Sequence, residues 1–246
     1  AALKNSGMFD VMREQGIDTL YYHQVDNPTA IVCDPAFLGY HLQRNAEVSV
    51  KVVSKRSADE KMGVVCDVDQ KTQIIEYSDL PSHIAERTDE AGQLLHWAGS
   101  TAIHVFNRDF LEQIADNDDQ FPFHRANKKV PHIDASGSQI TPEAPNAIKF
   151  ERFIFDVLPV ADTVLVYEID REREFNPLKN PEGQDSPATV HAALNRIAGE
   201  WLTACGVEVP GDCPVEISPL LALDAEDLKS KVPADLTING PLYLGE

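Results

Sequence analysis

The stretch at residues 19–28 constrains the fold of this chain more than any other. Residues 19–25 are rich in aromatic and β-branched side chains and favour a half-buried β-strand. Asp26-Asn27-Pro28 then ends the strand, because proline donates no backbone hydrogen bond and asparagine tolerates turn geometry. In an open α/β sheet, ligands bind beyond the carboxyl ends of the strands. Asp26 is therefore suited to hold a hard cation such as Mg²⁺, although an aspartate there can also simply cap the turn.

Strand-like and helix-like runs alternate over the first 170 residues, which predicts an α/β fold with a sheet at its centre. Proline and charge interrupt the pattern at residues 171–185, so we expect residues 1–180 to form the main domain. Residues 181–246 would then form a smaller C-terminal α+β part. Helices are expected at residues 3–15, 34–45, 109–115, 187–204 and 225–229, and strands at residues 19–25, 48–53, 62–68, 72–77 and 163–169.

Charge and cysteine content restrict the possible partners. The 246 residues carry a net charge of −19, which disfavours nucleic acid as a partner because phosphate-backbone binding needs a basic face. The chain contains no apolar run long enough to span a membrane. Its four cysteines are scattered and form no CxxC pair, which argues against a disulfide framework or a zinc site and fits a reducing cytoplasm.

Two further features could bind a sugar phosphate. Glu76-Tyr77 lies at the end of a predicted strand, and a carboxylate beside an aromatic ring can hold sugar hydroxyls, although it can also be an exposed strand-end acid. Lys149 and Lys179 lie in apolar surroundings within an acidic protein and need a counter-charge. Either a phosphate or a salt bridge to a neighbouring acid would supply it.

The segment around Ser100 is rich in small residues and leads into an apolar run. Small side chains there could let a ligand approach closely, or could serve ordinary packing. Four of the eight histidines, at positions 96, 104, 124 and 132, invite a metal-site interpretation but match no HExxH or CxxC pattern, and no GxSxG motif is present. A zinc enzyme and a serine hydrolase are therefore disfavoured.

Taken in order, ten short segments resemble the UDP-sugar pyrophosphorylase family, and most closely its UDP-N-acetylhexosamine (UDP-N-acetylglucosamine) pyrophosphorylase branch. The resemblance covers roughly residues 1–222. No single segment is decisive, and the specificity lies in their number and order. They are YHQVDN (22–27), KVV (51–53), GVVC (63–66), IEYS (75–78), AGSTAIH (98–104), PNAIK (145–149), FIFD (153–156), YE (167–168), FNPLKN (175–180) and EISPL (216–220).

The resemblance implies a mixed-sheet nucleotidyltransferase core of the nucleotide-diphospho-sugar transferase type. It also implies a Mg²⁺-dependent reaction of UTP with a sugar 1-phosphate that yields a UDP-sugar and pyrophosphate. By resemblance, Asp26 would lie at the nucleotide phosphates and Mg²⁺, Gly63 against the sugar, and Glu76 and Tyr77 at the sugar hydroxyls; Lys149 would contact UTP, Lys179 the phosphate of the sugar 1-phosphate, and Phe153 and Phe155 the sugar end of the pocket.

Two departures from the family pattern matter. Ser100 stands where the N-acetylhexosamine enzymes have an asparagine near the acetamido group, so the sugar that the chain would select is left open. The family's glycine-rich nucleotide loops lie upstream of Leu3, and the chain therefore resembles the C-terminal half of such an enzyme. We expect the core to be incomplete at its N-terminus, the chain alone to be inactive, and open strand edges to promote self-association.

Two alternatives remain at this stage. One is a non-catalytic module that binds sugar phosphates through Glu76, Tyr77 and Lys179. The other is a purely structural or interaction domain. A glycine-rich loop with lysine and arginine, encoded upstream of this chain, would favour the enzyme.

Overall fold

The computed structural model describes residues 2–117, 121–211 and 213–245, and it divides into two compact units. Unit 1 comprises Ala1–Tyr22 and Cys33–Glu168. Unit 2 comprises His23–Val32 and Ile169–Glu246. The boundary predicted at residue 180 lies inside unit 2, and the segment that carries Asp26 belongs to unit 2 although unit 1 surrounds it in sequence.

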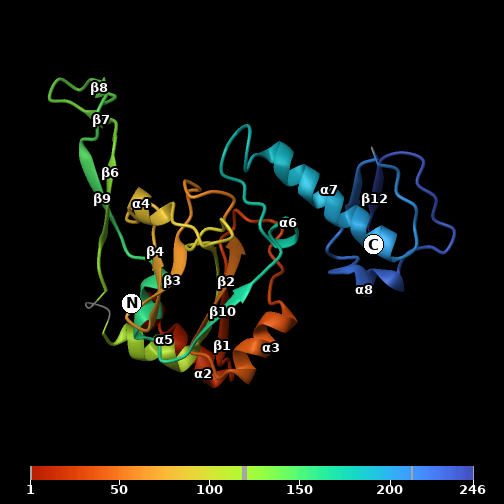
Figure 1. Ribbon diagram of the computed structural model, residues 1–246, viewed down its shortest axis with the longest axis horizontal. Helices are drawn as coiled ribbons and strands as arrows, with labels where there is room; N and C mark the ends of the chain where they lie inside the picture. The colour runs from red at the N-terminus through yellow and green to blue at the C-terminus, as the bar shows by residue number, and fades with distance from the viewer. Residues whose placement is uncertain (1, 118–120, 212, 246) are drawn as a thin grey trace. The chain divides into compact units, whose positions relative to one another are not determined.

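A six-stranded sheet forms the centre of unit 1 (Figure 1). β10 runs parallel to β2 and the other pairs are antiparallel, so the predicted α/β fold with a mixed sheet is confirmed. The strand order is β10-β2-β5-β3-β4, and β1 also pairs with β5. The strands are β1 (Thr19–Tyr22), β2 (Val48–Ser54), β3 (Val64–Val68), β4 (Lys71–Ile75), β5 (Ala98–Asn107) and β10 (Val164–Glu168).

β2 is buried on both faces, and the two faces differ in chemistry. On one face, Val48, Val50 and Val52 pack in an apolar core with Phe106 and Leu158. These valines occur at every second position, as expected for side chains on one face of a strand. The core therefore holds β2 and β5 together at the middle of the sheet.

The other face of β2 carries two buried polar side chains, and each has a partner on α3 (Pro35–Gln43) or at its N-cap. Ser49 Oγ lies 2.7 Å from His41 Nδ1, and Lys51 Nζ donates to Asp34 at 2.7 Å. Burial raises the pKa of the Asp34 carboxyl, but Lys51 and two backbone N–H groups outweigh it and hold that pKa below its usual value. Asp34 also accepts from Ala36 N and thereby caps the N-terminus of α3.

The N-terminal helix and the first strand are shorter than predicted. The helix expected at residues 3–15 is split into α1 (Ala2–Asn5) and α2 (Met8–Glu14) by Gly7, whose φ of +73° suits glycine. β1 ends at Tyr22, so Asp26 lies in the turn beyond the strand and not at its last residue. The prediction of a strand to residue 25 was therefore wrong at its end.

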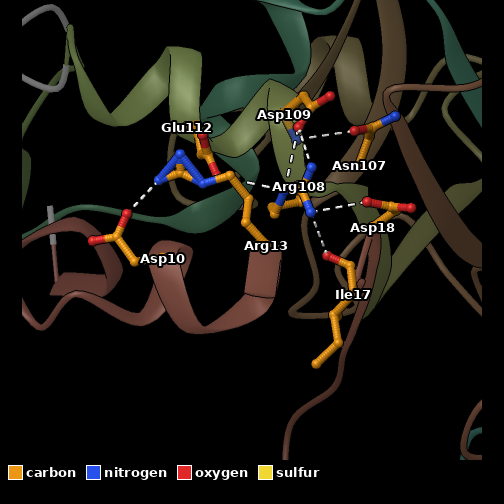
Figure 2. A network of polar contacts seen from close by, with 8 residues as sticks. All are labelled: Asp10, Arg13, Ile17, Asp18, Asn107, Arg108, Asp109 and Glu112. Carbon is orange, nitrogen blue, oxygen red and sulfur yellow. Dashed lines mark hydrogen bonds and ion pairs between the residues drawn. The ribbon is translucent and has the colours of Figure 1, made fainter. Parts of the chain in front are cut away.

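A charged network joins α2 to the start of α5 (Arg108–Ala115), as Figure 2 shows. Arg108 forms ion pairs with Asp18 at 2.9 Å and with Asp109 at 2.7 Å. Glu112 lies 3.4 Å from Arg108 and 3.7 Å from Arg13 of α2. One carboxylate therefore faces two guanidinium groups on two different helices, which ties α2 to α5.

An extended arm leaves the sheet region of unit 1, and Figure 1 shows it projecting away from the other strands. β6 (His124–Lys128) pairs antiparallel with β9 (Ala147–Glu151), and β7 (His132–Ile133) pairs with β8 (Gln139–Ile140) near the tip. The 3₁₀ helix η2 (Ile154–Val160) follows the arm and packs beside β4. The residue pattern in this region predicted no strands.

Unit 2 contains helices and a small parallel ladder of two strands. α7 (Pro187–Ala204) and α8 (Ala225–Lys229) match their predicted bounds. They enclose an apolar cluster around Leu202 and Leu228. The remaining elements are α6 (Arg171–Glu174), β11 (Val215–Ile217) and β12 (Leu242–Leu244); α4 (Ser82–Ala85) belongs to unit 1. No helix in the described part of the chain combines the length and apolar character needed to cross a membrane.

Candidate active site

Gly63 and Glu76 lie against each other in unit 1. An added Cβ at Gly63 would come within 3.0 Å of Glu76 Oε1 and 2.8 Å of Ile74 Cγ2. The pairing of β3 with β4 explains why the two residues are close, because Gly63 precedes β3 and Glu76 follows β4. The hairpin thus brings together two of the residues predicted at the sugar. Tyr77, the next residue, is 48% exposed.

Ser100 joins the same cluster through the backbone, since its N–H donates to Gly63 O at 2.8 Å. It lies at a β-bulge, where the partners of β5 on β2 change from Ile103–Lys51 to Ser100–Val52. Within the bulge, Ala102 has a φ of +56° and its N–H donates to Ser100 Oγ at 3.3 Å. Bulges re-aim side chains next to functional sites, and this one sets the direction of Ser100.

A pair of aromatic rings forms a wall beside Glu76. Phe153 and Phe155 stack with centroids 4.8 Å apart and an interplanar angle of 15°. Phe155 lines a cleft of about 420 Å³ together with Glu76, whereas Phe153 lines a neighbouring apolar cavity. Apolar walls with a few polar groups are typical of ligand clefts. The structure therefore brings the sugar-side residues together. Phe155 lines the cleft, and Phe153 stacks on Phe155 without lining the cleft itself.

Lys149 lies away from this cluster, on strand β9 of the arm. Its side chain is 58% exposed, and its Nζ forms an ion pair with Glu151 at 2.6 Å. The hydrogen bond from Lys149 lowers the pKa of the Glu151 carboxyl. The salt-bridge alternative therefore holds for Lys149 in this structure, and its predicted contact with UTP stays a prediction.

Asp26 and Lys179 are brought together in unit 2. Asp26 O accepts from Leu178 N at 2.7 Å, which places the two predicted phosphate-side residues on adjacent backbone segments. Lys179 Nζ lies 5.9 Å from the centroid of the Phe175 ring. Among the residues that the structure describes, neither the Asp26 carboxylate nor the Lys179 ammonium forms an ion pair, so both charges are available to a ligand.

Asn27 holds these two segments together, although the sequence predicts for it only a role in the turn. It is 4% exposed, and its Nδ2 donates to Glu174 O at 2.7 Å. Its Oδ1 accepts from Asn176 N at 3.1 Å and from Thr29 Oγ1 at 3.1 Å. The sequence shows an asparagine in a turn-forming segment. It does not show locally that the hydrogen-bond partners of this side chain are Glu174 O and Asn176 N, far along the chain.

The Asp26 carboxylate fits the predicted Mg²⁺ in its chemistry. Mg²⁺ takes oxygen ligands and is commonly bound by one or two carboxylates together with substrate phosphates. The described residues contain no group of three His, Cys, Asp or Glu side chains arranged for a metal ion. Asp26 alone would therefore have to share the ion with phosphate oxygens, as the prediction requires.

The comparison with known families decides where the chain belongs. The model of the family described as UTP–glucose-1-phosphate uridylyltransferase matches residues 1–184. The chain belongs to this family. The sequence resemblance to UDP-sugar pyrophosphorylases is thereby confirmed.

Individual relatives carry UDP-N-acetylhexosamine names. The UDP-N-acetylglucosamine pyrophosphorylase of Saccharomyces cerevisiae is 35% identical over 236 residues, a match covering 92% of this chain and 49% of the yeast protein. A crystal structure from Entamoeba histolytica, provisionally named a UDP-N-acetylglucosamine pyrophosphorylase, is 33% identical with a TM-score of 0.89 and covers 99% of this chain and 61% of its own. The chain spans about half the length of the curated relatives it matches.

A second solved structure supports the same fold. The UDP-N-acetylglucosamine pyrophosphorylase of Trypanosoma brucei, solved with an inhibitor, is 28% identical with a TM-score of 0.77. That match covers 91% of this chain and 47% of the other. The core predicted for a uridylyltransferase of this family is therefore the fold that the chain adopts.

Proposed function

We propose that this family member joins UTP to a sugar 1-phosphate, releasing pyrophosphate and forming a UDP-sugar. The observation that carries the proposal is the cleft beside Gly63, where Glu76 and Phe155 lie on facing elements. A carboxylate accepts hydrogen bonds from sugar hydroxyls, and an aromatic ring covers the apolar face of a pyranose. The names of the yeast and Trypanosoma brucei relatives, both UDP-N-acetylglucosamine pyrophosphorylases, agree with this use of the cleft.

Asp26 and Lys179 would serve the phosphates. A sugar 1-phosphate oxygen attacks the α-phosphorus of UTP, a new P–O bond forms, and the bond to pyrophosphate breaks. Because both reactants are anionic, charge neutralisation and in-line positioning do most of the work. Lys179 would bind the phosphate of the sugar 1-phosphate and Lys149 would bind UTP. Mg²⁺, held by Asp26 and phosphate oxygens, would neutralise the charge that the lysines leave.

No general base is needed in this scheme, because a sugar phosphate is already an ionised nucleophile at neutral pH. The protein's contribution is to bring two anions together and to exclude water, which strengthens every charge interaction in the site. The Lys179 ammonium, which forms no ion pair within the described part of the chain, lies on a segment beside that of Asp26 and suits this purpose.

The test is a kinetic comparison on the full-length protein. Wild type should form UDP-sugar and pyrophosphate from UTP and N-acetylglucosamine 1-phosphate in the presence of Mg²⁺. Lys179→Ala should raise KM for the sugar 1-phosphate about 10- to 100-fold, since it removes a charge-assisted phosphate contact. Lys149→Ala should raise KM for UTP instead, and Lys61→Ala, which changes an exposed lysine, should alter neither.

Binding of the sugar phosphate without any turnover would contradict the proposal and favour the non-catalytic module.

The choice of sugar forms part of the proposal. Ser100 lacks the side-chain amide of asparagine, so we expect glucose and galactose 1-phosphates to be used alongside N-acetylglucosamine 1-phosphate. Ser100→Asn should narrow that choice.

The four cysteines are free in the structure, and we place the enzyme in the reducing cytoplasm.

A further inference from the structure

His124 occupies a position that the proposed reaction does not yet use. It is the first residue of β6, and its side chain is 27% exposed at the edge of the cleft that Glu76 lines. Its ring lies 4.8 Å from Phe153 and 6.5 Å from Phe155, measured between centroids. The ring therefore stands against the aromatic wall of the cleft.

The edge of the ring is held by Asp156, which is only 10% exposed. His124 Nε2 lies 3.0 Å from Asp156 Oδ1 and 3.1 Å from Oδ2. Because a carboxylate only accepts hydrogen bonds, Nε2 must carry the hydrogen, and this fixes the orientation of the ring. Asp156 Oδ2 also accepts from Phe153 N at 3.1 Å.

Asp156 thus joins three elements at one carboxylate. It lies in the first turn of η2, accepts from the backbone of the residue that begins the aromatic wall, and binds the ring that starts the arm. A charge-assisted hydrogen bond to a nearly buried carboxylate is among the stronger polar contacts in proteins. The aromatic wall and the arm are therefore fixed relative to each other at this point.

The second nitrogen of His124 faces the opposite wall of the cleft. Nδ1 lies 3.9 Å from Asp79 Oδ2. Asp79 N donates to Glu76 O at 2.9 Å, so Asp79 belongs to the turn that carries Glu76. The His124 ring therefore lies between two carboxylates, that of Asp156 beside the aromatic wall and that of Asp79 in the turn that carries Glu76.

We propose that His124 is a positioning residue that sets the distance between the Phe153–Phe155 wall and the Glu76 turn, and with it the fit of the sugar end of the substrate. The proposal rests on the proposed function, because it assigns the cleft to the sugar. It predicts that removing the Nε2–H donor impairs use of the sugar 1-phosphate and leaves use of UTP intact.

Two substitutions separate the donor from the ring. His124→Phe keeps an aromatic ring against Phe153 but loses the hydrogen bond to Asp156. His124→Gln loses the ring but keeps an amide donor that reaches the position of Nε2. His132→Phe is the control, since His132 is an exposed histidine of the same arm whose Nδ1 lies 3.4 Å from Val130 O.

Kinetics of the full-length protein should distinguish these variants. His124→Phe should raise KM for N-acetylglucosamine 1-phosphate about tenfold, with kcat and KM for UTP within about twofold of wild type. His124→Gln should recover most of the loss, and His132→Phe should match wild type. An equal rise in both KM values, or no rescue by glutamine, would show that His124 only supports the fold and would overturn the proposal.

A second measurement does not depend on turnover. In full-length protein labelled with ¹⁵N-histidine, the Nε2–H of His124 should give a resonance that exchanges slowly with water. It should disappear in Asp156→Ala and persist in His132→Phe. If wild type forms no UDP-sugar, the proposed function fails; if it does but the resonance is absent, or sugar KM is unchanged in His124→Phe, the positioning role alone fails.

Discussion

Gly63 shows at the scale of one residue how the fold shapes the sugar side. It is buried, and it leaves room for the Glu76 carboxylate and for Ile74 directly beside it. Its φ lies outside the left-handed region, so the requirement for glycine comes from space and not from backbone conformation. Any side chain here would have to displace the Glu76 side of the cleft.

We expect Gly63→Ala to destabilise the protein by about 1–3 kcal/mol, because a Cβ that close to two neighbours overpacks the site. KM for the sugar 1-phosphate should rise as Glu76 moves. Urea unfolding and steady-state kinetics measure the two effects. Gly39→Ala is the matched control: nothing lies within 4 Å of its Cβ and it lies within α3, so it should be neutral or slightly stabilising. Wild-type KM in Gly63→Ala would show that the cleft tolerates the extra methyl group.

The sequence predicted which residues of the sugar side lie together, but it did not show which side chain pairs with Lys149. The sequence placed Gly63 and Glu76 at the ends of consecutive strands, and hairpin pairing alone brings such positions together. It did not reveal that Glu151, two residues along the same strand, takes the charge of Lys149. Side chains at i and i+2 share one face of a strand, so the pairing was readable once a strand was assigned there.

At the scale of elements, the turn after β1 and the segment after α6 form one structural piece. Asn27 supplies the polar contacts between them, and each of its side-chain atoms has a backbone partner on the later segment. Asp26 and Lys179 are carried by this piece. Their placement therefore depends on a buried amide that touches no substrate.

We expect Asn27→Leu to cost roughly 2–3 kcal/mol or more, since it removes the side-chain hydrogen bonds that Glu174 O and Asn176 N make with Asn27. Hydrogen exchange should accelerate at residues 23–32 and 169–180, and the unfolding midpoint in urea should fall. The control is Asn180→Ala, which removes one exposed side-chain hydrogen bond and should cost under about 1 kcal/mol. Unchanged exchange in Asn27→Leu would mean that backbone contacts alone join the segments.

Elements with a buried face were predicted well, and those without one were not. β2, β3, β4 and α7 carry the expected periodicity, because each packs against a core. The strands of the arm pair mainly with each other and are largely exposed, so no alternation of apolar residues marks them. The aromatic wall follows the arm, and its contact with His124 was hidden for the same reason.

At the scale of the whole molecule, acidity and open edges remain the dominant features. A net charge of −19 disfavours close packing of copies, whereas β4 and β10 end the sheet order of the described residues without a further partner. Self-association through such edges stays a prediction. Polar groups buried in the core set a second global property, the dependence of stability on pH.

His104 is the clearest case among these groups. It is fully buried on β5 between Tyr22 and Phe106, and neither of its ring nitrogens has a hydrogen-bond partner among the described residues. Burial lowers its pKa from 6.5 to about 4, because no neighbour compensates the charged form. His41 shows a lowered pKa from the same cause but keeps its contact with Ser49.

We expect the free energy of unfolding to fall as pH drops below 6.5, the usual pKa of histidine, towards the folded-state value of about 4. The unfolded chain binds a proton in this window that folded His104 refuses, so the stability present above pH 6.5 is lost on acidification. Between pH 6.5 and pH 5 the loss from His104 should be about 2 kcal/mol. Urea midpoints across this range measure it. His104→Phe should flatten the dependence apart from the smaller contribution of His41, whereas His83→Phe, which changes an exposed histidine, should leave it unchanged. An equally steep decline in His104→Phe would assign the acid sensitivity to other groups.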